Sequence, residues 1–222
     1  MSTITVTSRG HSCITFQRDG ATLVIDPGAF SDPAALDGAD AVLITHEHWD
    51  HLQVEPLVAA LGAGAELQVW APQDVVTKLG EAGADTGRVH AATPGESFEA
   101  AGFHVQALGG RHATIHPDMT PLANVAYLVE GAVLHPGDSL TPPPDGVALR
   151  VLLAPVSAPW LKLSEAIDYV RAVAAPLTVP IHDAILSDVG KDVVDGMMGG
   201  GFAGATEYRR LAPGEPLEVA AT

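Results

Sequence analysis

The sequence predicts an α+β protein, a four-layer αββα sandwich in which two facing sheets carry helices on their outer sides. Three observations indicate this fold. Alternating strand patterns recur in both halves of the chain, helical patterns follow several of them, and metal-binding residue types lie where strands end. The chain has 222 residues, 47% of them hydrophobic, which suits one large core. We therefore expect a single domain over residues 1–222.

The chain opens with strand patterns. Apolar and polar side chains alternate over residues 4–8 and 12–17, and a Gly-His pair separates the two segments as a turn would. A third strand over residues 22–25 stops at an Asp-Pro-Gly sequence, where proline and glycine force the chain out of a sheet. These segments predict a β-meander.

The next segment predicts a βαβα unit. The apolar run 41–44 indicates a buried strand, and residues 52–61 have apolar side chains at helical intervals. A strand over residues 67–71 follows, and Pro72 begins a second helix with one apolar stripe.

The remaining chain predicts a second sheet with its own helices. Short runs separated by Pro-Gly and Gly predict antiparallel strands at residues 89–93, 97–101 and 103–108. Later strands are expected at residues 124–129, 132–134, 149–153 and 177–179, and residues 217–219 are expected to close the second sheet. We expect Ser164 to cap a helix that runs to residue 173, and a last helix over residues 189–197.

The segment after the 41–44 strand carries the strongest functional signal. It contains three histidines and an aspartate, His46, His48, Asp50 and His51. A single His-x-His pair would be read as ordinary loop residues. Three histidines and a carboxylate at the end of a buried strand are different, because burying them unpaired costs several kcal/mol and one cation satisfies them together. We therefore predict a metal site.

This segment resembles the His-x-His-x-Asp-His signature of the metallo-β-lactamase superfamily. The resemblance implies two metal ions, the first held by His46, His48 and His112, the second by Asp50, His51 and His182, with Asp138 between them. His112 lies just past a strand end. His104 alternates with apolar neighbours and is expected to face solvent, and His116, four residues after His112, is the weaker alternative.

Two further motifs resemble the L-ascorbate-6-phosphate-lactonase-like branch of that superfamily, Gly10-His11-Ser12 and Ile25-Asp26-Pro27-Gly28. The resemblance places His11 near the metal cleft, although its role is expected to be structural. Asp26 either orients the ligand loop as a hydrogen-bond acceptor or serves only as a turn residue before proline.

The ligand set implies hydrolysis. Nitrogen and oxygen ligands suit Zn²⁺, with Mn²⁺ or Fe as alternatives. Two cations can lower the pKa of a shared water toward about 7, so we expect a bridging hydroxide as nucleophile. Asp50 is expected to orient this nucleophile and to pass its proton to the leaving group. The branch resemblance implies a lactone or related ester. A phosphodiesterase for a small substrate and a non-catalytic, metal-stabilised binding or sensing protein are the alternatives.

Composition limits the partners. The formal charge of −16, with only 11 Lys and Arg spread along the chain, disfavours nucleic acid and favours a small-molecule substrate. Bound metal would still allow that substrate to be anionic. Candidate substrate contacts are Arg111, Trp160 and Lys162, for each of which a surface or packing role is the alternative. His116 is a further candidate, as a second-sphere residue or a substrate contact, and Trp49 is expected to pack against the fold.

The compartment is predicted from absent signals. No apolar run reaches the roughly 18 residues of a membrane span, and the N-terminus has no basic and apolar signal regions. The single cysteine, Cys13, excludes an internal disulfide and fits a reducing compartment. A cytoplasmic protein without a membrane partner is expected, and the oligomeric state is not predicted.

Overall fold

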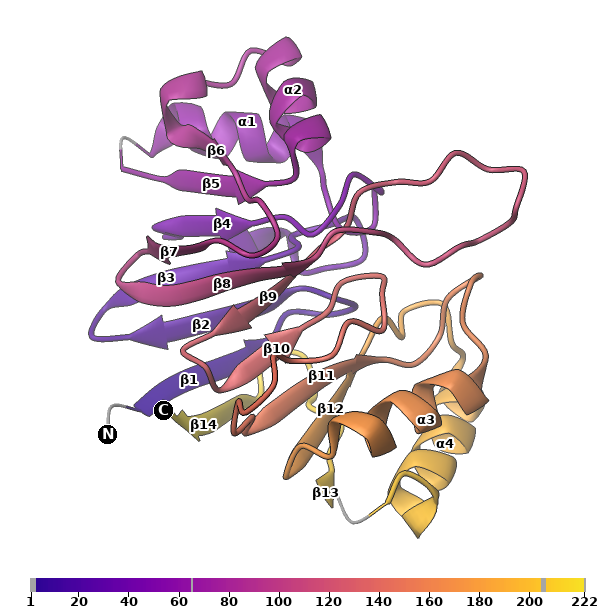
Figure 1. Cartoon of the computed structure of the whole chain (residues 1–222). Coiled ribbons are helices and arrows are strands. Elements are labelled where there is room, and N and C mark those ends of the chain that lie inside the picture. The colour runs from indigo at the N-terminus through magenta and orange to yellow at the C-terminus, as the bar shows by residue number, and fades with distance from the viewer. Residues whose placement is uncertain (1–2, 65, 205–206, 222) are drawn as a thin grey trace.

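Two facing β-sheets with helices on both outer sides form the molecule (Figure 1). The computed structural model describes residues 3–64, 66–204 and 207–221. Within these ranges each sheet has seven strands. The predicted αββα sandwich is confirmed.

The first sheet has the strand order β14-β1-β2-β3-β4-β5-β6. Its strands are β1 (Thr3–Ser8), β2 (Ile14–Arg18), β3 (Ala21–Ile25), β4 (Ala41–Leu43), β5 (Gln68–Ala71), β6 (Val89–Ala91) and β14 (Pro216–Ala220). The first three strands pair antiparallel as the predicted meander, and β3 to β6 run parallel. Helices α1 (Val54–Ala63) and α2 (Gln73–Glu81) cross over between the parallel strands, as the predicted βαβα unit requires.

The second sheet has the order β13-β12-β11-β10-β9-β8-β7. Its strands are β7 (Ser97–Ala100), β8 (Phe103–Gly109), β9 (Val125–Val129), β10 (Val133–His135), β11 (Val151–Pro155), β12 (Leu177–Ile181) and β13 (Glu207–Tyr208). Strands β7 to β10 are antiparallel, and β10 to β13 are parallel. Helices α3 (Leu163–Val173) and α4 (Asp188–Met197) lie on its outer side. Short helical turns occur at Pro33–Leu36, Thr86–Arg88 and Met198–Phe202.

Three apolar clusters hold these layers together. The central cluster lies between the sheets, with Phe16, Phe103 and Tyr127 fully buried in it. A second cluster packs α1 and α2 on the first sheet, and a third packs α3 and α4 on the second. Because burial of these apolar faces drives folding, the sandwich forms a rigid support for the loops at its edge.

The structure differs from the sequence prediction at three elements. Strand β6 is parallel to β5 in the first sheet, since α2 returns the chain over that sheet, and alternation alone does not specify strand direction. Strand β14 pairs with β1, so it closes the first sheet and not the second. Helix α3 begins at Leu163 with Lys162 as the N-cap, so Ser164 lies inside the helix and does not cap it; Glu165 accepts the backbone N–H of Lys162.

One edge of the sandwich gathers the loops that matter below. The loops after β1, β3, β4, β10, β11 and β12 meet there, together with the β8–β9 connection, residues 110–124. This connection extends away from the body as an arm (Figure 1). Among the described residues, no helix combines the length and apolar character needed to cross a membrane.

Candidate metal centre

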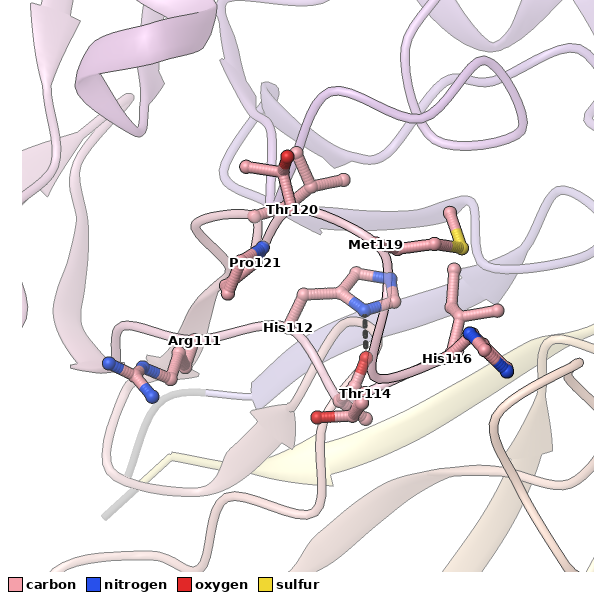
Figure 2. A pocket seen from close by; sticks show the side chains of 10 residues that line it. Arg111, His112, Thr114, His116, Met119, Thr120 and Pro121 are labelled. Carbon is pink, nitrogen blue, oxygen red and sulfur yellow. Dashed lines mark hydrogen bonds between the residues drawn. The ribbon is translucent and has the colours of Figure 1, made fainter.

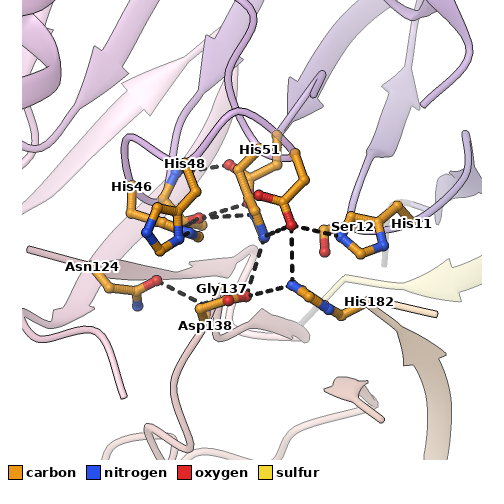
Figure 3. A network of polar contacts seen from close by, with 12 residues as sticks. His11, Ser12, His46, His48, His51, Asn124, Gly137, Asp138 and His182 are labelled. Carbon is orange, nitrogen blue, oxygen red and sulfur yellow. Dashed lines mark hydrogen bonds and ion pairs between the residues drawn. The ribbon is translucent and has the colours of Figure 1, made fainter. Parts of the chain in front are cut away.

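Two groups of potential metal ligands lie side by side at this edge (Figure 3). The first cluster consists of His46, His48, His112 and Asp138, and the second consists of His11, Asp50, His51 and His182. Within each cluster the ligand atoms lie within 4.8 Å of one another. The structure therefore brings together all seven side chains that the sequence and the resemblance named as ligands, and it adds His11 to the second cluster.

Two glycines allow the loops to approach this closely. A Cβ atom on Gly28 would overlap the backbone of Asp50, so the loop after β3 can pack on the ligand loop only with glycine there. Gly137 has φ +58°, and its Cβ would overlap the side chains of Asn124 and Thr45. Both contacts fix the backbone next to a ligand, since Asp138 follows Gly137 directly.

Hydrogen bonds orient three of the histidines so that one nitrogen of each faces the centre. His51 Nδ1 lies 2.7 Å from Asp26 Oδ2, and His182 Nδ1 lies 2.6 Å from the carbonyl oxygen of Ser157. His112 Nδ1 contacts the carbonyl oxygen of Ala113 in the same way. Because these oxygens only accept, each Nδ1 carries a proton, and each imidazole in its neutral form presents the lone pair of Nε2 to the site.

The fit to a cation follows from atoms left without hydrogen bonds. The buried atoms His51 Nε2, His112 Nε2, His182 Nε2 and Asp138 Oδ1 have no hydrogen-bond partner. The Nε2 atoms of His51 and His182 nevertheless lie 3.2 Å from Asp138 Oδ1. At this distance a protonated imidazole pairs with the carboxylate, but once the imidazoles are neutral, with their protons on Nδ1, lone pairs face lone pairs. Leaving such groups unsatisfied is costly, and a divalent cation with nitrogen and oxygen ligands satisfies them together.

Asp138 lies between the clusters. Its Oδ1 faces His51 and His182, and its Oδ2 lies 3.3 Å from His112 Nε2. The Asn124 side chain accepts the Asp138 backbone N–H at 2.9 Å, and the indole N–H of Trp160 donates to Oδ2 at 2.9 Å. The two carboxylate oxygens thus face different clusters, as a bridging ligand requires.

The carboxylate of Asp26 is fully buried and supports the ligand loop. Its Oδ1 accepts the backbone N–H of Thr45 at 2.8 Å, and its Oδ2 accepts the Thr45 hydroxyl at 2.7 Å. The same Oδ2 lies against His51 Nδ1. Of the two readings of Asp26, the contacts favour the orienting one, because the side chain bonds the ligand loop and not only its own turn.

His11 occupies a defined place beside Asp50. Its Nδ1 accepts the backbone N–H of Ala184 at 3.3 Å, so the ring proton lies on Nε2. This Nε2 is 3.2 Å from Asp50 Oδ2. His11 therefore donates to Asp50 in this arrangement, and its nitrogen next to the cluster carries a proton where a metal ligand needs a lone pair.

Burial and neighbouring charges shift the pKa values of the titratable groups in the centre in different directions. Burial opposes a charge on His51, but Asp138 and Asp26 outweigh it and raise the pKa of His51 to about 10. Burial, with His51 nearby, holds the pKa of His46 well below its ordinary value. For Asp50, burial is outweighed by the His11 hydrogen bond and by His51 and His182, which lower its pKa to about 2.

The candidate substrate contacts lie in different surroundings. Arg111 is exposed and points away from the His112 ring, and His116 is exposed beside Asp118 in the arm (Figure 2). Lys162 is exposed at the start of α3. Trp160 is half-buried, and its indole N–H donates to the Asp138 carboxylate. This N–H is therefore engaged by a neighbouring side chain.

The surroundings of Trp49 differ from those expected from the sequence. Trp49 is 60% exposed and contacts Phe30, with 4.6 Å between ring centroids, so the expectation that it packs into the fold is wrong. Its position in a loop of ligands points its side chain outward, because the neighbouring His48 and Asp50 face the clusters. His104 is exposed on β8, as expected from its alternation with apolar residues.

Sequence reasoning missed a buried support of the centre. His135 is fully buried, donates from Nε2 to the carbonyl oxygen of Ser12 at 2.8 Å and accepts the Gly137 N–H at 3.2 Å. It joins the Asp138 turn to the loop after β1. Asn124 is a similar support. Only the position of His135 at a strand end, next to the Gly-Asp pair, could have drawn attention to it.

An αββα sandwich that carries two His and Asp clusters at one edge defines the class of metallo-β-lactamase-fold proteins. The sequence profile of the beta-lactamase superfamily domain matches residues 5–182, and the chain belongs to this superfamily. The superfamily inferred from the ligand motif is thereby confirmed. The lactonase-like branch stays a prediction.

Relatives match along most of the chain. Protein Rv0786c of Mycobacterium tuberculosis is 37% identical over 199 residues, 87% of this chain and 90% of its own. A UPF0173 metal-dependent hydrolase of an Exiguobacterium species is 25% identical over 80% of this chain and 84% of its own. Igni18, a metallo hydrolase of the archaeon Ignicoccus hospitalis, superimposes with a TM-score of 0.72 at 20% identity, covering 98% of each chain, which shows the shared fold.

Proposed function

We propose that this protein is a metal-dependent hydrolase of a small molecule that uses two divalent cations, one in each cluster. The observation that carries the proposal is the set of four buried atoms without hydrogen-bond partners, three imidazole nitrogens and Asp138 Oδ1, that converge between the clusters. Two relatives that resemble the chain over most of its length are named metal-dependent hydrolases, which supports the same class.

The first cation would be held by His46, His48 and His112, the second by Asp50, His51 and His182, and Asp138 would contact both. Bound cations at these positions would supply Lewis-acid activation of water and of the substrate's carbonyl or phosphoryl oxygen. The mixed nitrogen and oxygen set suits Zn²⁺, with Mn²⁺ and Fe to be compared.

Asp50 is the residue of the centre best placed to move a proton. Its side chain is 17% exposed, whereas those of His51 and His182 are buried, so it borders both the cluster and the solvent from which a substrate arrives. The hydrogen bond from His11 holds its Oδ2. We assign to Asp50 the orientation of the attacking water and the transfer of its proton to the leaving group.

The bond that we propose is a lactone or related ester, on the support of the Gly-His-Ser and Asp-Pro-Gly motifs. Attack of water on the carbonyl carbon forms the new C–O bond and breaks the acyl C–O bond. The leaving alkoxide oxygen takes the proton that Asp50 passes on. A small phosphodiester is the alternative substrate, and a non-catalytic metal-stabilised binder is the alternative function.

The experiment is metal analysis followed by assay. The purified protein is stripped with chelator, reloaded with Zn²⁺, Mn²⁺ or Fe²⁺, and its bound metal is counted by elemental mass spectrometry. Each form is then tested on lactones, a phosphodiester and a thioester. We expect two metal ions per chain and turnover of a lactone that chelator abolishes.

Asp50→Asn separates an enzyme from a binder. It should lower kcat by about 10²-fold or more, the scale of a lost general acid-base group, without unfolding the protein. The matched control is Asp168→Asn, a carboxylate on α3 with 77% of its side chain exposed. If the wild type binds metal but turns over no substrate class, the protein is better described as a non-catalytic binding or sensing protein.

A further inference from the structure

The large apolar side chains that the described residues leave exposed fall into two groups. Val189, Val193 and Met197 lie on α4, with Phe202 just beyond it. Phe30, Trp49, Met119 and Ile185 lie in loops at the metal-centre edge. We call these last four the apolar rim.

Each member of the apolar rim belongs to a loop that also carries a cluster residue or its support. Trp49 stands between His48 and Asp50 in the sequence. Phe30 lies in the loop that follows Asp26, and Ile185 follows Ala184, whose backbone N–H bonds His11. Met119 belongs to the arm and lines a small cavity there together with His112 (Figure 2).

Contacts connect the rim to the centre. The rings of Trp49 and Phe30 meet edge to face at 4.6 Å, and Phe30 meets His11 at 5.2 Å. His11 in turn contacts Asp50. The exposed fractions are 38% for Phe30, 60% for Trp49, 51% for Met119 and 53% for Ile185. Isolated exposed apolar residues are ordinary on protein surfaces, but four of them on separate loops around one buried centre form an apolar approach to it.

Charges next to the rim favour an uncharged group there. Arg9 pairs with Asp32, Lys78 with Glu47, and Arg210 with Asp183 and Asp195. Since these cations are already engaged by carboxylates, they offer little attraction to a multiply anionic substrate. Arg111, which lines the same cavity as Met119, points away from the His112 ring (Figure 2). Binding of an apolar group on the rim is favourable instead, because contact with aromatic and aliphatic side chains removes apolar surface from water.

We infer that the substrate carries a bulky apolar group, an alkyl chain or an aromatic ring, which lies on the rim formed by Phe30, Trp49, Met119 and Ile185 while its ester or lactone bond enters the centre. The inference rests on the proposed function, since it names the substrate class of the same site.

The test compares γ-butyrolactone with γ-octalactone and γ-decalactone on the zinc-loaded protein. Each fully buried methylene group increases binding affinity about fourfold. Because this rim is open and buries the chain only in part, we expect kcat/KM to rise about tenfold from butyrolactone to octalactone. Trp49→Ala should lower kcat/KM on decalactone at least about fivefold more than it lowers kcat/KM on butyrolactone. Most of this difference should lie in KM. The control Val193→Ala, an exposed apolar residue on α4, should keep the wild-type preference.

A binding measurement separates this inference from the proposed function. Tryptophan emission of the Asp50→Asn protein is followed as γ-decalactone is added, with γ-butyrolactone as control, and Trp49→Phe identifies the responding residue. A blue shift that depends on Trp49 supports the rim even if no lactone is hydrolysed, in which case only the hydrolase proposal fails. Equal kcat/KM on short and long lactones with no shift overturns the rim and leaves the hydrolase intact. A shift with phosphatidylcholine vesicles but not with monomeric decalactone also overturns it, in favour of a membrane surface.

Discussion

The imidazole of His11 and the carboxylate of Asp50 form a directed pair: His11 Nε2 lies 3.2 Å from Asp50 Oδ2, and the other ring nitrogen accepts the Ala184 N–H. The backbone of His11 takes part as well, because its carbonyl oxygen accepts the His182 N–H at 3.1 Å. One residue from the beginning of the chain thus holds one proposed ligand of the second cation by its side chain and another by its backbone.

Removal of the His11 side chain should therefore act on Asp50. We expect His11→Ala to lower kcat by about 10- to 100-fold in the zinc-loaded protein, the usual cost of losing a hydrogen bond to a metal ligand. His11→Gln, whose amide nitrogen can reach the position of Nε2, should recover most of this loss. Steady-state kinetics with metal counts measure both. If His11→Ala instead binds one ion fewer and His11→Gln does not recover it, His11 is a ligand and not a donor to Asp50.

Trp160 should control metal affinity through Asp138. Trp160→Phe keeps an aromatic ring but removes the N–H that bonds Asp138 Oδ2, so we expect zinc affinity to fall by about tenfold. Competition with a chromophoric chelator measures this affinity. Trp70→Phe, which alters a half-buried indole stacked on Phe98, is the control and should leave it unchanged. Equal affinities of Trp160→Phe and the wild type would contradict an orienting role for the indole.

The stability of the metal-free protein should fall as the pH rises. The pKa of His51 in the folded state is about 10, above the ordinary 6.5, because Asp138 and Asp26 overcome the effect of burial. A raised pKa stabilises the folded state fully below about 6.5, and this contribution is lost as the pH rises toward 10. Thermal melts of chelator-treated protein between pH 6 and pH 10 should therefore show a decreasing Tm.

Zinc binding should release the same proton. At pH 8 the metal-free His51 is protonated, and metal coordination requires its neutral form. Calorimetric titrations in two buffers with different ionisation enthalpies should give different apparent heats, from which the number of protons released is obtained. Asp26→Asn removes one of the two carboxylates that hold the proton and should reduce the number released. Identical heats in both buffers for the wild type would show that His51 is neutral before zinc binds.

Gly137 should be intolerant of any side chain. Gly137→Ala introduces a Cβ that overlaps Asn124 and Thr45 at φ +58°, and we expect a loss of about 3 kcal/mol or more in unfolding free energy. Gly38→Ala is the matched control, since Gly38 also has a positive φ, +72°, but no atom lies within 4 Å of its Cβ position. It should cost only about 1 kcal/mol. Urea unfolding measures both, and similar losses would mean that backbone strain and not the overlap limits Gly137.

Local patterns made much of the fold and centre predictable. The segment from His46 to His51 predicts a metal site because it contains several ligand-type residues in one short stretch directly after a buried strand. The βαβα unit follows from periodicity in the same way. His112 and His182 were placed by the resemblance, since each alone is a single histidine after a strand.

Features that depend on distant segments were not predictable. β14 could have joined either sheet, and only its pairing with β1 decides between them. The outward direction of Trp49 depends on which neighbours face the clusters. The tautomer of His11 depends on a backbone N–H that is 173 residues away in sequence. Periodicity and residue type carry no information on such contacts.

The distribution of the clusters along the chain bears on how the protein is made. The first cluster is complete with Asp138, whereas the second also needs His182, which follows β12. A nascent chain that has left the ribosome only as far as β11 holds every donor of the first cluster and lacks one of the second. All donors of the first cluster are thus synthesised before the last donor of the second, so the second cluster depends on the segment that follows β11.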